Sequence, residues 1–177
     1  MINIGFKKLA ENAIIPTKAH ATDSGFDLYA AQSVIIRPEQ TVVVSTGIAC
    51  VLPPEHEATI RNRSGVTAKT KLRVQLGTID NGYTGDLGVI VDNINPTRYN
   101  LNGTTVSSSE LLTVKGEAAI RPEGSTTDFP VGTYIINEGD KIAQLVVTPL
   151  PAAAAYEITG ELDGSERGDN GFGSTGA

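Results

Sequence analysis

Apolar residues alternate with polar or small residues at a period of two in several separate stretches of this 177-residue chain. Alternation of this kind, or a run of β-branched residues, occupies 2–6, 34–36, 41–46, 72–76, 87–91, 134–136 and 145–147. Successive side chains of a strand point to opposite faces, so the pattern predicts half-buried β-strands. Only residues 66–71 suggest a short turn of helix. Because glycine, proline, asparagine and aspartate separate the runs, the sequence predicts an all-β sandwich, jelly roll or small barrel.

Charge and cysteine content narrow the classes of partner. The formal net charge is −6, so we expect no broad basic face for a nucleic-acid backbone. A phosphate ligand would therefore be a small one, held by a few placed groups. The single cysteine, Cys50, has apolar neighbours and is predicted to be a buried structural thiol in a reducing compartment. With no signal peptide and no membrane span in the sequence, we expect a cytoplasmic protein, in the host cytoplasm if the chain is viral.

The order of strand-like and loop-like segments predicts a core with an insertion and an arm. Residues 1–150 would form the core, interrupted at 95–131 by a loop-rich insertion with one strand-like patch at 111–114. Surface insertions cost little stability, so this segment does not argue against the core. Two prolines and a run of alanines follow, and they predict that residues 151–177 form an extended C-terminal arm.

Residues 167–177 combine closely spaced glycines with an arginine, one aromatic ring and a Ser-Thr pair. A glycine-rich backbone can turn successive N–H groups toward an anion, as phosphate loops do. A frayed terminus is the alternative reading, but flexible linkers seldom carry a residue such as Phe172. We therefore expect a lid that orders over a phosphorylated ligand with a flat ring.

Asn81-Gly82 predicts a type I′ hairpin, because both central positions of that turn take positive φ. Such a turn would place Asp80 and Tyr83 opposite one another at the hairpin tip. A carboxylate beside an aromatic ring on a rigid turn would suit the wall of a binding pocket. An ordinary polar hairpin with a cross-strand aromatic is the alternative reading.

Three further segments carry polar groups in positions that call for an explanation. Ser64 could cap the short helical turn, and Arg63 beside it could present a planar fork to phosphate oxygens. Asp27 begins a strand-like run, where an acidic residue is unexpected, and this suggests a role near a hydrated cation. Gln144 is an amide in an apolar strand and needs hydrogen-bond partners, whereas Asp140-Lys141 is expected to be a solvated turn pair.

In combination and order, these segments resemble the five motifs of the homotrimeric dUTPases, which hydrolyse dUTP to dUMP and pyrophosphate. The resemblance spans 23–176 apart from the insertion, and its most specific patterns are Arg-Ser-Gly at 63–65, Gly-x-Ile-Asp-x-x-Tyr-x-Gly at 77–85 and Arg-Gly-x-x-Gly-Phe-Gly-Ser-Thr-Gly at 167–176. It implies a β jelly roll that forms a trimer with three sites at the subunit interfaces. Each site would take the first, second and fourth motifs from one chain, the hairpin from another and the tail from the third.

The resemblance also implies roles for individual residues. Asp80 would be the general base that deprotonates the attacking water. Asp27 would reach a Mg²⁺ ion through bound water, with the ion on the triphosphate oxygens. The residues that would bind dUTP are Arg63, Ser64, Gly65, Gly77, Thr78, Ile79, Tyr83, Gly88, Gln144, Arg167, Phe172, Gly173, Ser174 and Thr175.

Two other functions remain open at this point. One is a nucleotide enzyme of the dCTP deaminase type, although the deaminating base of that family is a glutamate and the hairpin acid here is Asp80. The other is a regulatory protein on a dUTPase fold. Insertions at this place resemble those of some dUTPases from phages of Gram-positive bacteria, so residues 95–131 suggest a phage origin and a repressor partner. No nucleic acid and no membrane are expected as partners.

Overall fold

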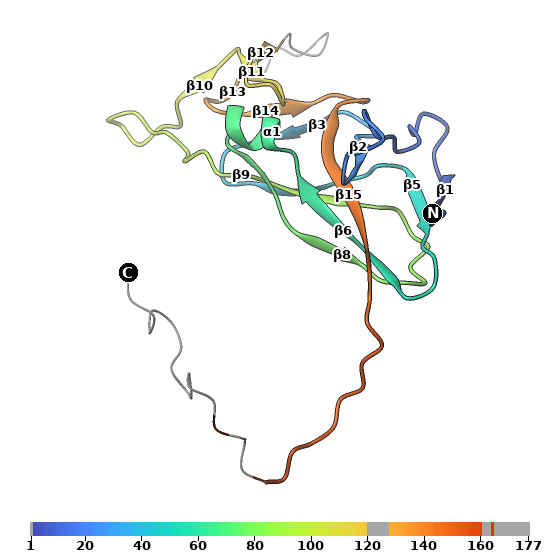
Figure 1. Ribbon diagram of the computed structural model, residues 1–177. Helices are drawn as coiled ribbons and strands as arrows, with labels where there is room; N and C mark the ends of the chain where they lie inside the picture. The colour runs from blue at the N-terminus through green and yellow to red at the C-terminus, as the bar shows by residue number, and fades with distance from the viewer. Residues whose placement is uncertain (1, 120–127, 161–163, 165–177) are drawn as a thin grey trace.

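The computed structural model describes residues 2–119, 128–160 and 164 (Figure 1). Its elements in chain order are β1 (Gly5–Lys8), β2 (Phe26–Tyr29), β3 (Val34–Ile36), β4 (Thr41–Val44), β5 (Ile48–Val51), β6 (His56–Asn62), α1 (Ser64–Lys69), β7 (Leu72–Val74), β8 (Gly77–Ile79), β9 (Val89–Asn93), β10 (Ser107–Ser108), β11 (Leu111–Leu112), β12 (Ala118–Ala119), β13 (Phe129–Pro130), β14 (Tyr134–Ile136) and β15 (Lys141–Pro149). The prediction of an all-β fold is therefore confirmed, with one short helix close to the predicted position.

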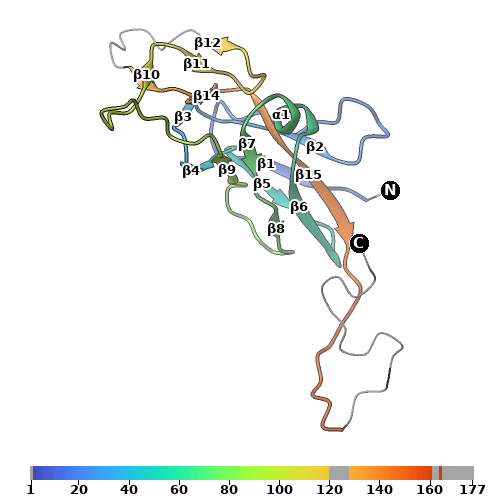
Figure 2. The same ribbon diagram turned by 90° about the vertical axis from the view of Figure 1, so that its left-hand side faces the viewer.

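Two sheets supply most of the core. One has the strand order β2-β15-β6-β8 and the other β4-β9-β7, and all of these pairs are antiparallel. The two sheets lie against one another in Figure 2. The largest fully buried side chains are aliphatic and come from these two sheets, from β3, β5, β11 and β14, and from the loop before β9: Leu28, Ile36, Val44, Ile48, Ile60, Leu72, Leu87, Val89, Leu111, Ile136, Ile142 and Leu145.

Side chains alternate between buried and exposed positions in β4, where Val44 is buried and its neighbour Val43 is 65% exposed. The alternation predicted from the sequence is therefore present in this strand.

At the N-terminus the predicted strand was misplaced: β1 is Gly5–Lys8 rather than 2–6, and it pairs with β5. Pairing with β5 fixes that register, because Phe6 lies opposite Cys50 and packs edge-to-face on Phe26. Cys50 is buried, as predicted, and burial raises the pKa of its thiol.

The predicted insertion contains short strands that attach to the body. β11 pairs in parallel with β14, so the sheet β12-β11-β14-β3 joins the insertion to the core (Figure 1). Leu111 and Phe129 from the insertion cover Ile135 of β14 and form a small second hydrophobic cluster. Within the predicted patch 111–114, only Leu111–Leu112 is strand.

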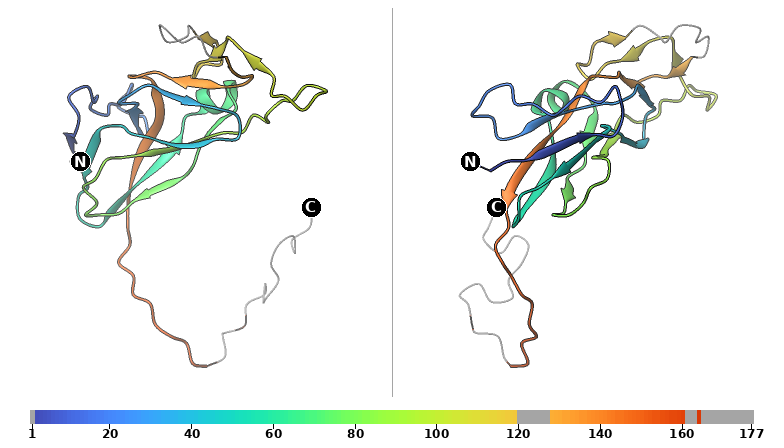
Figure 3. Two further views of the ribbon diagram at one scale, coloured as in Figure 1. Left: turned by 180° about the vertical axis from the view of Figure 1, so that it is seen from behind. Right: turned by 90° about the vertical axis from the view of Figure 1, so that its right-hand side faces the viewer.

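Residues 150–160 contain no helix or strand and lead away from the body in every view (Figure 3). The predicted lid residues, Arg167, Phe172, Gly173, Ser174 and Thr175, lie outside the described residues. Among the described residues, no helix is long and apolar enough to cross a membrane.

Candidate functional site

A polar cavity of ≈ 230 Å³ lies where β2, β15 and the junction of β6 with α1 meet. Its lining residues are Ala19, Asp23, Asp27, Arg63, Ser64, Gly65, Lys141 and Gln144. Strand pairing accounts for the assembly, because Gln144 of β15 lies opposite both Asp27 of β2 and Arg61 of β6. The fold thus gathers the predicted residues of three separate motifs around one cavity.

Two cations pair with the Asp27 carboxylate, whose side chain is only 14% exposed. Arg63 Nη1 donates to Asp27 Oδ1, and Lys141 Nζ lies 2.8 Å from Asp27 Oδ2. Asp23 lines the same cavity but accepts a hydrogen bond from the His20 N–H at 2.9 Å, so both cations are directed to Asp27. The cavity that holds Arg63 and Lys141 is called the cationic cavity below. Burial lowers the pKa of the Arg63 guanidinium, but arginine starts so high that it stays charged at neutral pH.

The expected solvated pair between Asp140 and Lys141 was wrong. Asp140 Oδ2 accepts a hydrogen bond from the Asn137 N–H at 2.8 Å, while Lys141 turns to Asp27. A register shift in β15 between Lys141 and Ala143 explains the difference, because it brings Lys141 to the same cavity as Gln144. An unbroken strand would send residues three apart to opposite faces. Sequence reasoning therefore missed Lys141 as a site residue.

Ser64 does not cap the helix, contrary to the prediction. Helix α1 begins at Ser64 itself, and the capping position is held by Arg63 with extended backbone angles and no capping bond from its side chain. The helix-capping residue is therefore one position earlier than expected. Ser64 instead contributes to the cavity wall beside Gly65.

Gln144 has the partner that a polar amide in an apolar strand requires. Its Nε2 donates to the Asn62 carbonyl at 3.0 Å. A Cβ on Gly25 would lie 2.8 Å from Gln144 Oε1 and 3.0 Å from its Cβ, so glycine at position 25 leaves the room that the amide occupies. Gly25 is a positioning residue that sequence reasoning did not single out.

A second cavity, of ≈ 360 Å³, lies at the turn after β8. Its lining residues are Val43, Thr78, Ile79, Asp80, Tyr83, Asp86, Gly88 and Ile90. Asp80 is exposed, and its carboxylate has no hydrogen-bond or ion-pair partner within the described chain. The Tyr83 hydroxyl donates to the Asp86 carbonyl at 3.0 Å, which holds the ring at the cavity wall. The fold therefore places a free carboxylate beside an aromatic ring, as the sequence predicts.

The predicted type I′ hairpin was wrong, although the turn itself exists. The Tyr83 N–H bonds to the Asp80 carbonyl at 3.1 Å, but only Gly82 of the central pair has positive φ, at 97°. Asn81 instead uses its side-chain amide to anchor the turn, donating to the Pro53 carbonyl at 2.7 Å and the His56 carbonyl at 3.1 Å. β8 pairs with β6 rather than with the residues after the turn.

The two cavities share no lining residue, and strand register separates them. Arg63 follows the last residue of β6, whereas Ile79 pairs with Ala58 near the beginning of that strand, so Asp80 lies near the opposite end. Six residues of strand span about 20 Å. One chain therefore holds the free carboxylate and the cationic cavity at opposite ends of β6.

Metal-ligating residues are sparse around both cavities. Within the described ranges, no three histidine, cysteine, aspartate or glutamate side chains are grouped closely enough to hold a metal ion. Asp27 is already paired with two cations. The few carboxylates around these cavities suit a cation that is already bound to an anionic ligand better than a cation that the protein would have to bind by itself.

The comparisons with known proteins agree on one family. A family model described as dUTPase matches residues 11–104 and 130–176. The deoxyuridine 5′-triphosphate nucleotidohydrolase of Clostridioides difficile is 36% identical over 178 residues, covering 99% of each chain. The dUTPase of Staphylococcus bacteriophage 80alpha, solved with dUpNHpp, superposes with a TM-score of 0.88 at 31% identity over 99% of each chain.

A mutant dUTPase from phage phi11 of S. aureus, which coordinates a structural Mg(II) ion, gives a TM-score of 0.81 at 33% identity, covering 92% of this chain and 99% of its own. The matched residues include both cavities. The chain belongs to the dUTPase family.

Proposed function

We propose that this protein hydrolyses dUTP to dUMP and pyrophosphate, with Asp80 as the general base. The observation that carries the proposal is the Asp80 carboxylate, which has no partner among the described residues and is exposed in a cavity beside Tyr83. A general base must be free to accept a proton from water, and a carboxylate held in an ion pair would be less able to do so. Asp80 would take the proton from the water that attacks the α-phosphorus.

The uracil end of the substrate would bind along β8. This strand lies at the edge of its sheet and, within the described part of the chain, pairs with β6 alone, so one row of its backbone groups remains for a ligand. The backbone from Gly77 to Ile79 would then hydrogen-bond the uracil edge. Tyr83 would pack under the deoxyribose. A Cβ on Gly88 would lie 2.7 Å from Val43 Cγ1, so glycine keeps this wall open.

The triphosphate would bind in the cationic cavity. Arg63 offers a planar fork for phosphate oxygens, and Ser64, Gly65 and Gln144 add polar contacts around it. Lys141 adds a second cation that sequence reasoning did not include. Mg²⁺ carried on the triphosphate would neutralise its charge, with Asp27 holding one of the water ligands of the ion. Rate enhancement would come from positioning and from this balance of charge, without a covalent intermediate.

Because Asp80 and Arg63 lie at opposite ends of β6, we propose that each site is completed by neighbouring chains of a homotrimer. Val43 and Ile90 are cross-strand partners that are 65% and 39% exposed, and both line the Asp80 cavity. Such an exposed apolar pair beside a half-site suits burial in a subunit contact. The glycine-rich tail of a third chain would close the site.

Asp80→Asn tests the proposed role of Asp80. The amide keeps the shape of the side chain but cannot accept the proton, so we expect turnover to fall by about 10²–10⁴-fold. Binding of the dUTP analogue dUpNHpp should change little. Asp92→Asn is the matched control, because Asp92 lies on β9 and accepts hydrogen bonds from Thr41 and Gln75 away from both cavities. Full turnover by Asp80→Asn with normal binding would refute the mechanism.

A further inference from the structure

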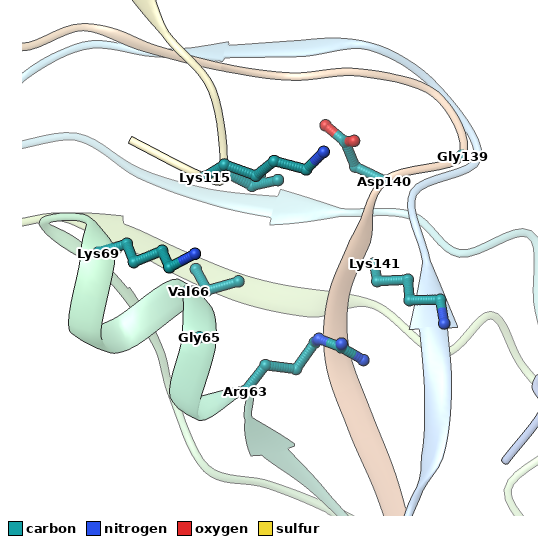
Figure 4. Close-up of a pocket in the computed structure, with 9 residues that line it drawn as sticks. Arg63, Gly65, Val66, Lys69, Lys115, Gly139, Asp140 and Lys141 are labelled. Carbon is teal, nitrogen blue, oxygen red and sulfur yellow. The ribbon is translucent and has the colours of Figure 1, made fainter. Parts of the chain in front are cut away.

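A third cavity, of ≈ 330 Å³, adjoins the cationic one and shares Arg63, Gly65 and Lys141 with it. Its other walls are Val66 and Lys69 of α1, Val114 and Lys115 of the insertion, and Gly139 and Asp140 before β15. Figure 4 shows Lys69 extending from α1 and Lys115 extending from the insertion, both toward the segment that carries Asp140 and Lys141. Three separate parts of the chain therefore enclose a space that continues from the proposed triphosphate pocket.

The cavity carries an excess of positive charge. Arg63, Lys69, Lys115 and Lys141 line it, against one carboxylate of the wall, Asp140. Asp27 balances part of the charge of Arg63 and Lys141, which leaves a surplus of two positive charges. Within the described residues, neither Lys69 nor Lys115 forms an ion pair with a carboxylate. In a chain of net charge −6, such a local surplus favours an anionic ligand.

The turn that carries Lys115 is fixed on both sides. Val114 is buried in the main core, and the Gly116 N–H closes the turn on the Thr113 carbonyl at 2.9 Å. Gly116 has φ of 75°, and a Cβ there would lie 2.4 Å from the Lys69 carbonyl oxygen. The backbones that carry Lys115 and Lys69 are thus in close contact. Two lysines anchored in this way lose less conformational freedom on binding an anion than two on mobile loops would.

We propose that this cavity is a phosphate subsite, to which the insertion contributes Lys115. The match to the dUTPase family model omits residues 105–129, so Lys115 lies outside the pattern that defines the family. Since the cavity opens onto the proposed triphosphate pocket, its ligand is a phosphate group of pyrophosphate or of the distal end of the substrate. The identification of this phosphate as part of the substrate or product rests on the proposed function, whereas the charge and shape of the cavity are independent of it.

Titration calorimetry with inorganic pyrophosphate tests the subsite directly. The variant is Lys69→Gln with Lys115→Gln, and the control is Lys71→Gln, an exposed lysine after α1 that does not line the cavity. We expect the dissociation constant to rise about tenfold for each lysine removed, or about 1.4 kcal/mol each, and to stay unchanged in the control. All three lysine changes lie at exposed positions, and a thermal melt of each variant checks that it folds. A dissociation constant within about twofold of wild type would overturn the proposal.

Titration of the same proteins with dUpNHpp separates the two sources of phosphate. If the distal end of the triphosphate occupies the subsite, the double variant binds the analogue more weakly while its affinity for dUMP is unchanged. If only free pyrophosphate uses it, the double variant loses affinity for pyrophosphate and keeps it for the analogue. If the double variant binds both pyrophosphate and the analogue as tightly as wild type, the subsite does not exist. Failure of the wild type to hydrolyse dUTP is a separate result, because these titrations require no turnover.

Discussion

Asp27→Asn removes the charge that holds two cations at the proposed triphosphate pocket. The asparagine has the shape of the aspartate but cannot balance Arg63 and Lys141. Hydrogen bonds to charged groups contribute about 1.5–3 kcal/mol, and the Arg63 contact is largely shielded from solvent. Lys141 is 43% exposed, so its pair with Asp27 is worth only about 0.2–1 kcal/mol.

The asparagine carbonyl can still accept one bond from Arg63, which returns about 1 kcal/mol. The expected net loss in the free energy of unfolding is therefore about 2 kcal/mol. For a chain of this length, that corresponds to a fall in melting temperature of about 4–8 °C. Substrate affinity should fall as well, because Arg63 loses the contact that orients its guanidinium.

Urea denaturation followed by circular dichroism measures the loss, at one protein concentration for all variants because assembly adds to apparent stability. Asp92→Asn is again the control, since Asp92 has hydroxyl and amide partners rather than cations. Lys141→Met, alone and combined with Asp27→Asn, gives the coupling between the two charges, expected at about 0.5 kcal/mol. An Asp27→Asn variant as stable as wild type, with zero coupling, would refute this role for Asp27.

Three more outcomes follow from the same geometry. Gly116→Ala should lower the free energy of unfolding by about 2 kcal/mol, from positive φ and from the clash with the Lys69 carbonyl; an unchanged urea midpoint would contradict that packing. Trimers refolded from equal amounts of Asp80→Asn and Arg63→Gln should regain about a quarter of wild-type dUTP hydrolysis, because a site shared between chains can combine two intact halves; no recovery would place both halves in one chain. Chelation of divalent cations should abolish most hydrolysis and added Mg²⁺ should restore it, whereas an unchanged rate would exclude the proposed role of the ion.

Local pattern was enough to predict several of the strands and the buried cysteine. Alternation at 41–46 and 87–91 is a property of the residues themselves, and β4 and β9 follow from it with small changes of boundary. Asp80, Tyr83 and Gln144 each line a cavity, as the sequence suggested for Asp80 and Tyr83. These features depend on short stretches of sequence, so they could be predicted without knowledge of the rest of the chain.

Long-range contacts decided the features that the sequence did not predict. Lys141 reaches Asp27 only because β15 shifts register after it, and a register shift depends on the strands on either side. Asn81 anchors its turn to carbonyl groups that lie more than twenty residues earlier, which favours a turn other than type I′. The small hydrophobic cluster under the insertion likewise joins Leu111 to Ile135.

Some inferences from the sequence remain predictions. The division into a core of residues 1–150, an insertion and an arm of 151–177 is one, and the lid role of the tail is another. A repressor partner for residues 95–131 and a cytoplasmic location are also untested. Pull-downs from cell lysate with intact protein and with a variant lacking 97–130 address the partner, and identical sets of bound proteins would end that hypothesis.

Release of pyrophosphate by the purified wild-type protein, measured in parallel with dUTP, dTTP, dCTP and UTP, tests the central claim most directly. The β8 backbone and the Tyr83 ring should favour dUTP strongly over the other three nucleotides, since unmatched hydrogen bonds and steric closure penalise each of them. The same samples are assayed for ammonia. Rapid release from dUTP alone, without ammonia, is the predicted result. Equal release from all four nucleotides, or ammonia from dCTP, would contradict it.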